Sequence, residues 1–215
     1  MSDGKKGIRI AVLVSGQGRG TNLQAIIDAC EAGMVDGRIA VVIGVRDDAP
    51  AMDRARNHGI PAVSLSPKVI GSEEAYETAL LANLRYYNVD LVCLAGYTRK
   101  VGQGIIDAYR NRIMNVHPAL IPMFFGVGMY GHHVHEAAIR RGVKVSGATV
   151  HFVDEDYDTG PIIIQRVVPV LFEDTPDTLA ARILPEEHKA YAEAIQLFAQ
   201  GRLKVEGRRV RILED

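Results

Sequence analysis

An amide and an imidazole lie two residues apart in the segment Asn115-Val116-His117-Pro118. Residues two apart in a strand point to the same side, so Asn115 and His117 are able to face one reacting atom. The amide N–H and the N–H of a protonated imidazole would together stabilise an oxyanion that develops on that atom. The pair therefore indicates a catalytic site, although a histidine considered by itself is more often structural.

A carboxylate further along the chain is a candidate partner for this histidine. Asp158 lies in the acidic loop DEDYDTG, which covers residues 154–160. A carboxylate beside His117 would raise the pKa of the imidazole and orient the ring. The alternative interpretation is that Asp158 is only a turn residue before Thr159-Gly160, since Asp and Gly are common in turns.

A glycine-rich segment, Ser15 to Asn22 (SGQGRGTN), connects an apolar run to a helical pattern. Glycine allows a ligand to approach the backbone closely, and the free N–H groups at a helix start attract anions. The segment is not a P-loop, because it lacks Gly-Lys followed by Ser or Thr. We favour a phosphate monoester as its ligand. Two alternatives stay open: a dinucleotide, with Asp47 binding its ribose, and a tight turn without a ligand.

Histidines are concentrated in the second half of the chain, where five of the seven lie at positions 117 to 151. The run His-His-Val-His lacks the spacing of a zinc site and has no cysteine nearby. The acidic residues at 154–158 lack the pattern of an EF-hand calcium loop. We therefore expect no metal, and we expect His135 and Glu136 to cap or line the helix that follows them.

Alternating apolar runs and helical patterns predict the elements that position these motifs. The predicted strands cover residues 8–15, 38–45, 61–65, 89–95, 112–116, 148–153 and 161–170. The predicted helices cover 22–32, 50–57, 73–87, 105–109 and 175–200. We expect Thr21 or Asn22 to cap the first helix and Pro185 to interrupt the last one. Residues 120–135 are predicted to form a long loop, and a hairpin is predicted to turn at Glu206-Gly207.

This order predicts an α/β fold with a doubly wound, mainly parallel, Rossmann-like sheet and an antiparallel C-terminal extension. Ligands of such sheets bind beyond the carboxyl ends of the strands. Residues 16–22, 96–101 and 115–117 all follow or end predicted strands. We expect a single domain over residues 1–215, in which about 7–117 form the phosphate-binding half and about 118–200 the second portion.

Composition restricts the class of protein. The chain has 215 residues, 47% of them hydrophobic, and 25 basic against 26 acidic residues give a net charge of -1. Such a chain can form a large core, and it lacks the basic excess of nucleic-acid or membrane-surface binders. No apolar run reaches the ~20 residues that a membrane span requires. Cys30 and Cys93 are expected to be core thiols of a reducing compartment, which favours a soluble cytoplasmic protein.

Five segments, in this order, resemble the phosphoribosylglycinamide formyltransferases: SGQGRGTNLQAIIDAC, LAGYTRKV, NVHPALIP, SGATVHFVDEDYDTGPII and EEHKAYAEAI. The resemblance extends from Ile10 to about Lys204. It implies the formyltransferase fold and transfer of a formyl group from the co-substrate 10-formyltetrahydrofolate to the amine of glycinamide ribonucleotide, in purine biosynthesis. It implies no metal, and a monomer or homodimer. A formyltetrahydrofolate hydrolase, another formyltransferase of this fold, and a non-catalytic nucleotide-binding module are the alternatives.

The resemblance also implies a role for particular residues. Asn115 and His117 would bind the oxyanion, with Asp158 raising the pKa of His117. The phosphate and ribose would be bound by Gly20, Thr21, Asn22 and Glu187. The folate would be bound by Thr98, Arg99, Lys100, Val101, Asn115, Asp154 and Asp158, with residues 154–158 on the far side of its pocket.

Three positions depart from the pattern of this family. Arg19 lies in a phosphate loop with two extra residues, where it is expected to add a cationic contact. Glu73 stands where many relatives have an arginine for the folate, with Lys68 as a substitute nearby. Phe125-Gly126 replaces Pro-Gly and is followed by VGMYGHHVHE.

Overall fold

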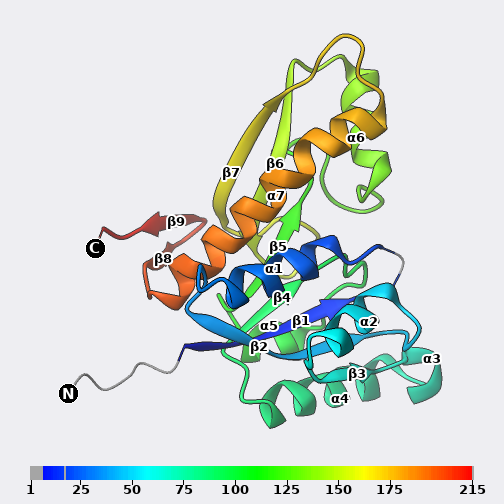
Figure 1. Cartoon of the computed structure of the whole chain (residues 1–215), viewed down its shortest axis with the longest axis vertical. Helices are drawn as coiled ribbons and strands as arrows, with labels where there is room; N and C mark the ends of the chain where they lie inside the picture. The colour runs from blue at the N-terminus through cyan, green and yellow to red at the C-terminus, as the bar shows by residue number, and fades with distance from the viewer. Residues whose placement is uncertain (1–6, 17, 215) are drawn as a thin grey trace.

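A computed structural model of the chain describes residues 7–16 and 18–214 (Figure 1). Within these residues, nine strands form one sheet in the order β3-β2-β1-β4-β5-β6-β7-β9-β8. The strands are β1 (Ile8–Val14), β2 (Gly37–Gly44), β3 (Ala62–Ser64), β4 (Leu91–Leu94), β5 (Ile113–His117), β6 (Val145–Phe152), β7 (Ile162–Pro169), β8 (Leu203–Glu206) and β9 (Arg209–Ile212). The helices are α1 (Thr21–Glu31), α2 (Pro50–Asn57), α3 (Pro67–Ile70), α4 (Glu73–Tyr86), α5 (Gln103–Ala108), α6 (His132–Arg141) and α7 (Pro176–Ala199).

The predicted sheet is confirmed: β1 to β5 are parallel, and β6 pairs antiparallel with β5 and β7. The C-terminal hairpin of β8 and β9 adds to β7 through a single parallel pair, Ile162 with Arg209. β6, β7 and α6 extend away from the parallel strands (Figure 1). The change from parallel to antiparallel pairing comes at β5, the strand that carries Asn115 and His117.

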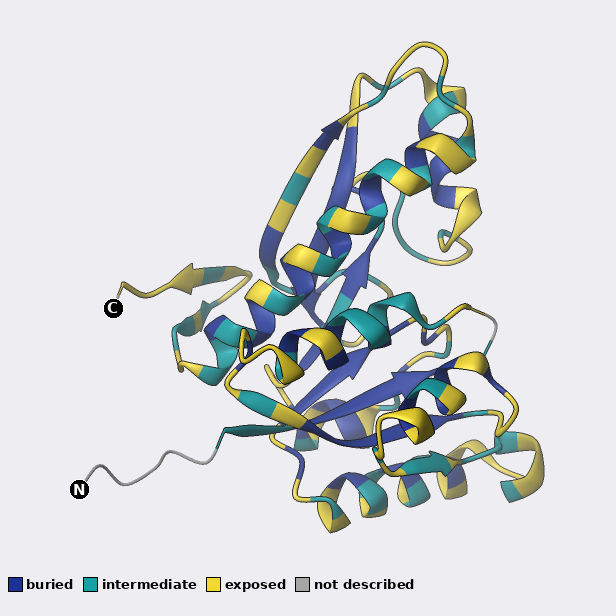
Figure 2. Ribbon diagram, in the orientation of Figure 1, coloured by how far each residue is buried: buried dark blue, intermediate teal, exposed yellow. Residues whose placement is uncertain are grey.

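Strand β1 is buried on both faces, as a central parallel strand requires. Ile10, Val12 and Val14 pack into a cluster with α1, α2 and α7. Ala11 and Leu13 pack into a second cluster with α4 and α5 on the opposite face. Figure 2 shows the resulting layers, with buried strands between helices whose outer faces are exposed. This alternation explains why the apolar run of residues 8–15 has no polar face.

Helix α7 crosses the parallel strands and is fixed to two of them. The Tyr191 hydroxyl lies 3.0 Å from the carbonyl oxygen of Leu94 in β4 and 2.9 Å from that of Met114 in β5. The predicted interruption at Pro185 is wrong, because α7 is one continuous helix. Buried side chains on both sides of Pro185, including Ile183 and Tyr191, hold the helix against the sheet. Their packing offsets the backbone hydrogen bond that proline removes.

Other elements agree with the sequence to within a few residues, with two differences. The N-cap of α1 is Gly20, not Thr21 or Asn22, because the chain enters the helix through a left-handed residue with φ of 71°. The short helix α3 was not predicted, since four residues are too few to show a helical period. Among the described residues, no helix is both long enough and apolar enough to cross a bilayer.

We predict that Gly160→Ala destabilises the fold by at least about 3 kcal/mol, because the new Cβ would overlap the carbonyl oxygen of Phe152. Urea denaturation followed by circular dichroism measures the change. Gly18→Ala is the control: a Cβ there meets no atom within 4 Å, so stability should stay within about 0.5 kcal/mol. A Gly160→Ala variant that unfolds at the wild-type urea concentration would contradict this packing.

Candidate active site

A cavity of about 440 Å³ lies beyond the carboxyl ends of the parallel strands. Its wall includes Asn115 and His117 from β5, Asp158 from the acidic loop, Asn22 from α1 and Glu187 from α7. Thr98 and the loop of residues 126–131 complete much of the remaining wall. The structure therefore brings together, in one cavity, residues that are up to 165 positions apart in the sequence.

Asn115 and His117 both contact the carboxylate of Asp158. The side-chain amide of Asn115 donates to Oδ1 of Asp158 at 3.2 Å, and Nδ1 of His117 lies 3.5 Å from Oδ2. The backbone N–H of Gly126 donates to the same Oδ2 at 3.3 Å. The two side chains therefore lie on one side of β5, and Asp158 is more than a turn residue.

His117 is buried, and its Nε2–H donates to the carbonyl oxygen of Phe124 at 2.7 Å. A neutral ring with this proton has its Nδ1 lone pair facing Asp158, so protonation of Nδ1 completes an ion pair. The expected effect of Asp158 is present, since its carboxylate raises the pKa of His117. Burial lowers the pKa below its usual value, and the opposing effects of Asp158 and the Phe124 carbonyl are smaller.

Asp158 is ionised although it is largely buried. Burial raises the pKa of this carboxyl, but His151, His117 and the Gly126 N–H together lower it below the usual value. The backbone of Asp158 is left-handed, with φ of 57°, which directs the chain back toward β7. The carboxylate thus supplies a fixed negative charge next to both His117 and Asn115.

Sequence reasoning gave no role to His151, which completes this cluster. His151 is 1% exposed, and its position in β6 pairs directly with Asn115 in β5. Its Nδ1–H donates to the Phe152 carbonyl at 2.8 Å, and its Nε2 lies 3.3 Å from the Asn115 amide and 3.5 Å from Asp158. The register between β5 and β6 would have indicated His151, but a single sequence does not give that register.

The glycine-rich segment meets α2 at the start of α1. A Cβ on Gly20 would lie 3.0 Å from that of Ala51, so the loop and α2 are in close contact. Arg54 of α2 donates from Nε to the carbonyl oxygen of Arg19 at 2.9 Å, while the Arg19 side chain is exposed. The sequence predicts an anion site at the first N–H groups of α1, and of the residues expected to form it Asn22 lines the cavity. Gln17 lies outside the described residues.

Glu187 connects α7 to this anion site. The Asn22 amide donates to Oε2 of Glu187 at 3.2 Å, and the Asn22 side-chain oxygen is buried without a partner. Glu187 is 8% exposed, and burial raises the pKa of its carboxyl to about 7, against the smaller effect of the Asn22 hydrogen bond. A carboxyl with this pKa changes its charge near neutral pH.

A second, smaller cavity of about 50 Å³ lies between the segment of residues 97–101 and the acidic loop. Val101 contributes to its wall, and Lys100 closes it by an ion pair with Asp156 at 3.3 Å. Thr98 is fixed elsewhere, since both its N–H and its hydroxyl donate to Oγ of Ser15, at 2.8 and 3.2 Å. Asp154 lines the cavity and accepts a hydrogen bond from Thr159 at 2.5 Å.

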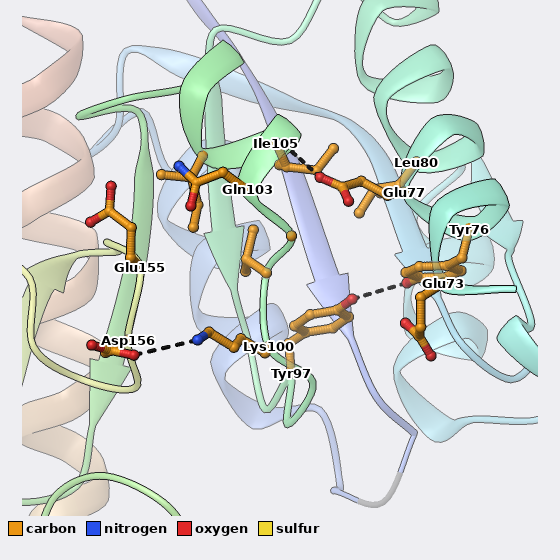
Figure 3. A pocket seen from close by; sticks show the side chains of 13 residues that line it. Glu73, Tyr76, Glu77, Leu80, Tyr97, Lys100, Gln103, Ile105, Glu155 and Asp156 are labelled. Atoms are coloured by element: carbon orange, nitrogen blue, oxygen red, sulfur yellow. Dashed lines mark hydrogen bonds and ion pairs between the residues drawn. The ribbon is translucent and has the colours of Figure 1, made fainter.

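A third cavity, of about 440 Å³, continues from the second past Lys100 (Figure 3). The Tyr76 and Tyr97 hydroxyls lie 3.0 Å apart, and the Glu77 carboxylate accepts a hydrogen bond from the backbone N–H of Ile105. Dashed lines in Figure 3 mark both contacts. Glu73 forms an ion pair with Arg99, whose guanidinium also lies over the Tyr76 ring. Arg99 is therefore bound by protein groups, and it lines the second cavity and not the first.

No metal-binding group is indicated. Within residues 7–16 and 18–214, no three His, Cys, Asp or Glu side chains are arranged to hold a metal ion. His132 instead lies between two carboxylates, with Nδ1 3.0 Å from Glu136 and Nε2 3.1 Å from Asp177 of α7. The hydrogen bond with Glu136 is the main reason that the pKa of His132 is raised. These contacts fix the start of α6 to α7.

Known proteins resemble this chain both in sequence and in fold. Residues 8–195 match a family described as Formyl transferase. The phosphoribosylglycinamide formyltransferase of Escherichia coli K12 is 38% identical over 92% of this chain and 90% of its own length. A solved structure of glycinamide ribonucleotide transformylase 1 from Symbiobacterium toebii superposes with a TM-score of 0.91 and is 51% identical, over 99% of this chain and 96% of that one.

A plant relative is longer than this chain. The chloroplastic phosphoribosylglycinamide formyltransferase of Vigna unguiculata is 42% identical over 91% of this chain, which spans 62% of the plant protein. The similarity therefore covers nearly all of this chain but only part of that relative.

We predict that Asp158→Asn lowers the pKa of His117 further. The carboxylate raises that pKa, so removing its charge leaves burial unopposed by the nearest anion. Titration of the His117 ring by NMR measures the shift. Asp156→Asn is the control, because this exposed residue of the same loop pairs with Lys100 and not with His117. An unchanged or higher His117 pKa in Asp158→Asn would show that the carboxylate has no effect on the ring.

We predict that Glu187→Gln stabilises the protein at pH 8 but not at pH 4. The folded-state pKa of about 7 exceeds the ordinary 4.5, so the wild type loses stability as the pH rises between these values. The glutamine side chain does not ionise, so the variant does not lose this stability. At pH 8 its free energy of unfolding, measured by urea denaturation, should exceed that of the wild type by up to about 3 kcal/mol. Glu186→Gln, one residue earlier in α7, is the control for removing a carboxylate. A gain of the same size at both pH values would refute the linkage.

Proposed function

The chain belongs to the formyl transferase family, and from this premise we propose that it transfers the formyl group of 10-formyltetrahydrofolate to the amine of glycinamide ribonucleotide, in purine biosynthesis. The observation that carries the proposal is the contact of Asn115 and His117 with one buried carboxylate, Asp158, in the cavity that also contains Asn22 and Glu187. Asn22, at the start of α1, lines the same cavity as the two oxyanion donors.

The reaction requires donors to a developing oxyanion. The amine nitrogen forms a bond to the formyl carbon, and the carbonyl electrons move to oxygen. The amide of Asn115 and the imidazolium of His117 are the donors that stabilise this oxygen. The bond from carbon to N10 then breaks; the attacking nitrogen loses one proton and N10 gains one. Asp158 favours the charged form of His117 against its burial.

Both donors are engaged within the protein before substrate binds. Asn115 donates to Asp158, and His117 donates to the carbonyl of Phe124. Phe124 has a left-handed backbone, with φ of 52°, in the loop that leads to the cavity wall. We infer that the substrate oxygen replaces at least the Phe124 carbonyl, so that binding exchanges hydrogen bonds and does not add them to unoccupied groups.

The proposed substrates would occupy different cavities. The phosphate would bind the first N–H groups of α1 at Gly20, Thr21 and Asn22, and the ribose would lie near Glu187. The pterin would enter the cavity between the segment of residues 97–101 and the acidic loop. At about 50 Å³ that cavity holds little more than a water molecule, so the loop must move outward to admit the ring.

Each proposed substrate site draws on both portions of the chain. The acceptor site combines α1 with Glu187 of α7, and the donor site combines residues 97–101 with the acidic loop. A single domain over residues 1–215, with about 7–117 and about 118–200 as its two portions, remains our proposal. A monomer or homodimer, and a cytoplasmic location, remain proposals with it.

The test is the formation of tetrahydrofolate from 10-formyltetrahydrofolate, measured spectrophotometrically with and without glycinamide ribonucleotide. We expect turnover only when the ribonucleotide is present. Replacing His117 by Ala should lower kcat by ~10²–10³-fold, because a donor to the oxyanion is lost.

His133→Ala, an exposed histidine of α6, is the control and should keep normal turnover. Turnover without the ribonucleotide would instead identify a hydrolase, in which the anion site at α1 has no role. Near-normal turnover of the His117 variant would reject its assignment as a donor.

A further inference from the structure

His135 is a third imidazole in the acceptor cavity, and the mechanism above does not use it. It belongs to α6 and is 5% exposed, yet it lines the same cavity as His117 and Glu187. Its Nδ1 is buried and has no hydrogen-bond partner. A buried polar atom without a partner is uncommon in proteins and calls for a physical explanation.

The unpartnered nitrogen defines the tautomer of the ring. A buried N–H without an acceptor is rare, so the proton belongs on Nε2 and Nδ1 keeps its lone pair. Burial, together with His132 and His117, lowers the pKa of His135 to about 4, and the ring is therefore neutral at physiological pH. A neutral ring has one N–H, and the nitrogen left to face the cavity is Nε2.

Helix α6 brings His135 to the wall of the cavity that Asn115, His117 and Asp158 also line. Helix α6 packs against α7, the helix that carries Glu187. The ion pairs of His132 with Glu136 and Asp177 fix its first turn. The loop of residues 126–131, which lines the cavity, leads directly into this turn. His135 is thus held on a rigid element close to His117.

We propose that Nε2–H of His135 donates a hydrogen bond to the carboxamide oxygen of the acceptor, and so positions the amine that attacks. The proposal rests on the proposed function. The other acceptor groups have partners: the phosphate has the N–H groups of α1, and the ribose hydroxyls have the Glu187 carboxylate. The carboxamide oxygen is the group that remains, and only one carbon separates its carbonyl from the amine nitrogen. A single neutral donor suits a carbonyl oxygen.

Three variants separate this role from simple packing. His135→Leu removes the donor and should raise KM for glycinamide ribonucleotide about 10-fold, which corresponds to a lost hydrogen bond, with KM for the formyl donor unchanged. His135→Gln places an amide N–H near the position of Nε2, so its KM for glycinamide ribonucleotide should stay within about threefold of the wild-type value. His135→Asn places its amide near Nδ1, so its KM for glycinamide ribonucleotide should rise as much as that of the leucine variant. The urea midpoint of His135→Leu should equal or exceed that of the wild type, because a buried polar atom without a partner is removed.

His133→Leu, on the exposed side of the same helix, is the matched control and should leave both KM values unchanged. An acceptor KM that His135→Leu does not change, or equal losses in the Gln and Asn variants, would overturn the proposal. The comparison of Gln with Asn decides the question if the leucine variant does not fold. If the wild type does not use glycinamide ribonucleotide at all, the proposed function itself is refuted. The wild-type assay shows this before any variant is made.

Discussion

The Asp158 carboxylate is a charge held inside the protein, and the arrangement of the site depends on it. A buried carboxylate is costly unless hydrogen bonds and opposite charge compensate for its loss of water. Groups from three separate segments do so: Asn115 and His117 on β5, His151 on β6 and the backbone of Gly126. The carboxylate therefore determines where each of these side chains points. It also connects the loop between the antiparallel strands β6 and β7 to β5, the last parallel strand.

The same carboxylate opposes the effect of burial on His117. Burial favours a neutral ring, whereas catalysis by hydrogen-bond donation to an oxyanion favours a charged one. Asp158 and the Phe124 carbonyl move the balance toward the charged form without reversing it. A ring balanced in this way gains a proton when an anion develops beside it. This behaviour suits a group that must stabilise charge in the transition state and not before it.

The parallel sheet was predictable, because its strands are apolar on both faces and glycine or polar residues follow their ends. The cluster of Asn115, His117 and Asp158 was predictable as a set, since strand alternation and the acidic loop indicate it. His151 and the pKa of His117 were not: one depends on the register between β5 and β6, the other on depth of burial. The continuity of α7 through Pro185 was missed because tertiary packing outweighs local propensity.

The three cavities adjoin one another, because neighbouring cavities share wall residues: Asn115 and Asp158 for the first pair, Lys100 and Asp156 for the second. Under the proposed function, acceptor and donor occupy adjoining cavities at the same time and meet at β5. The formyl group then passes from one substrate to the other without ever being attached to the protein. Both substrates must bind before either product leaves. Initial-velocity plots should therefore intersect, whereas a double-displacement enzyme gives parallel lines.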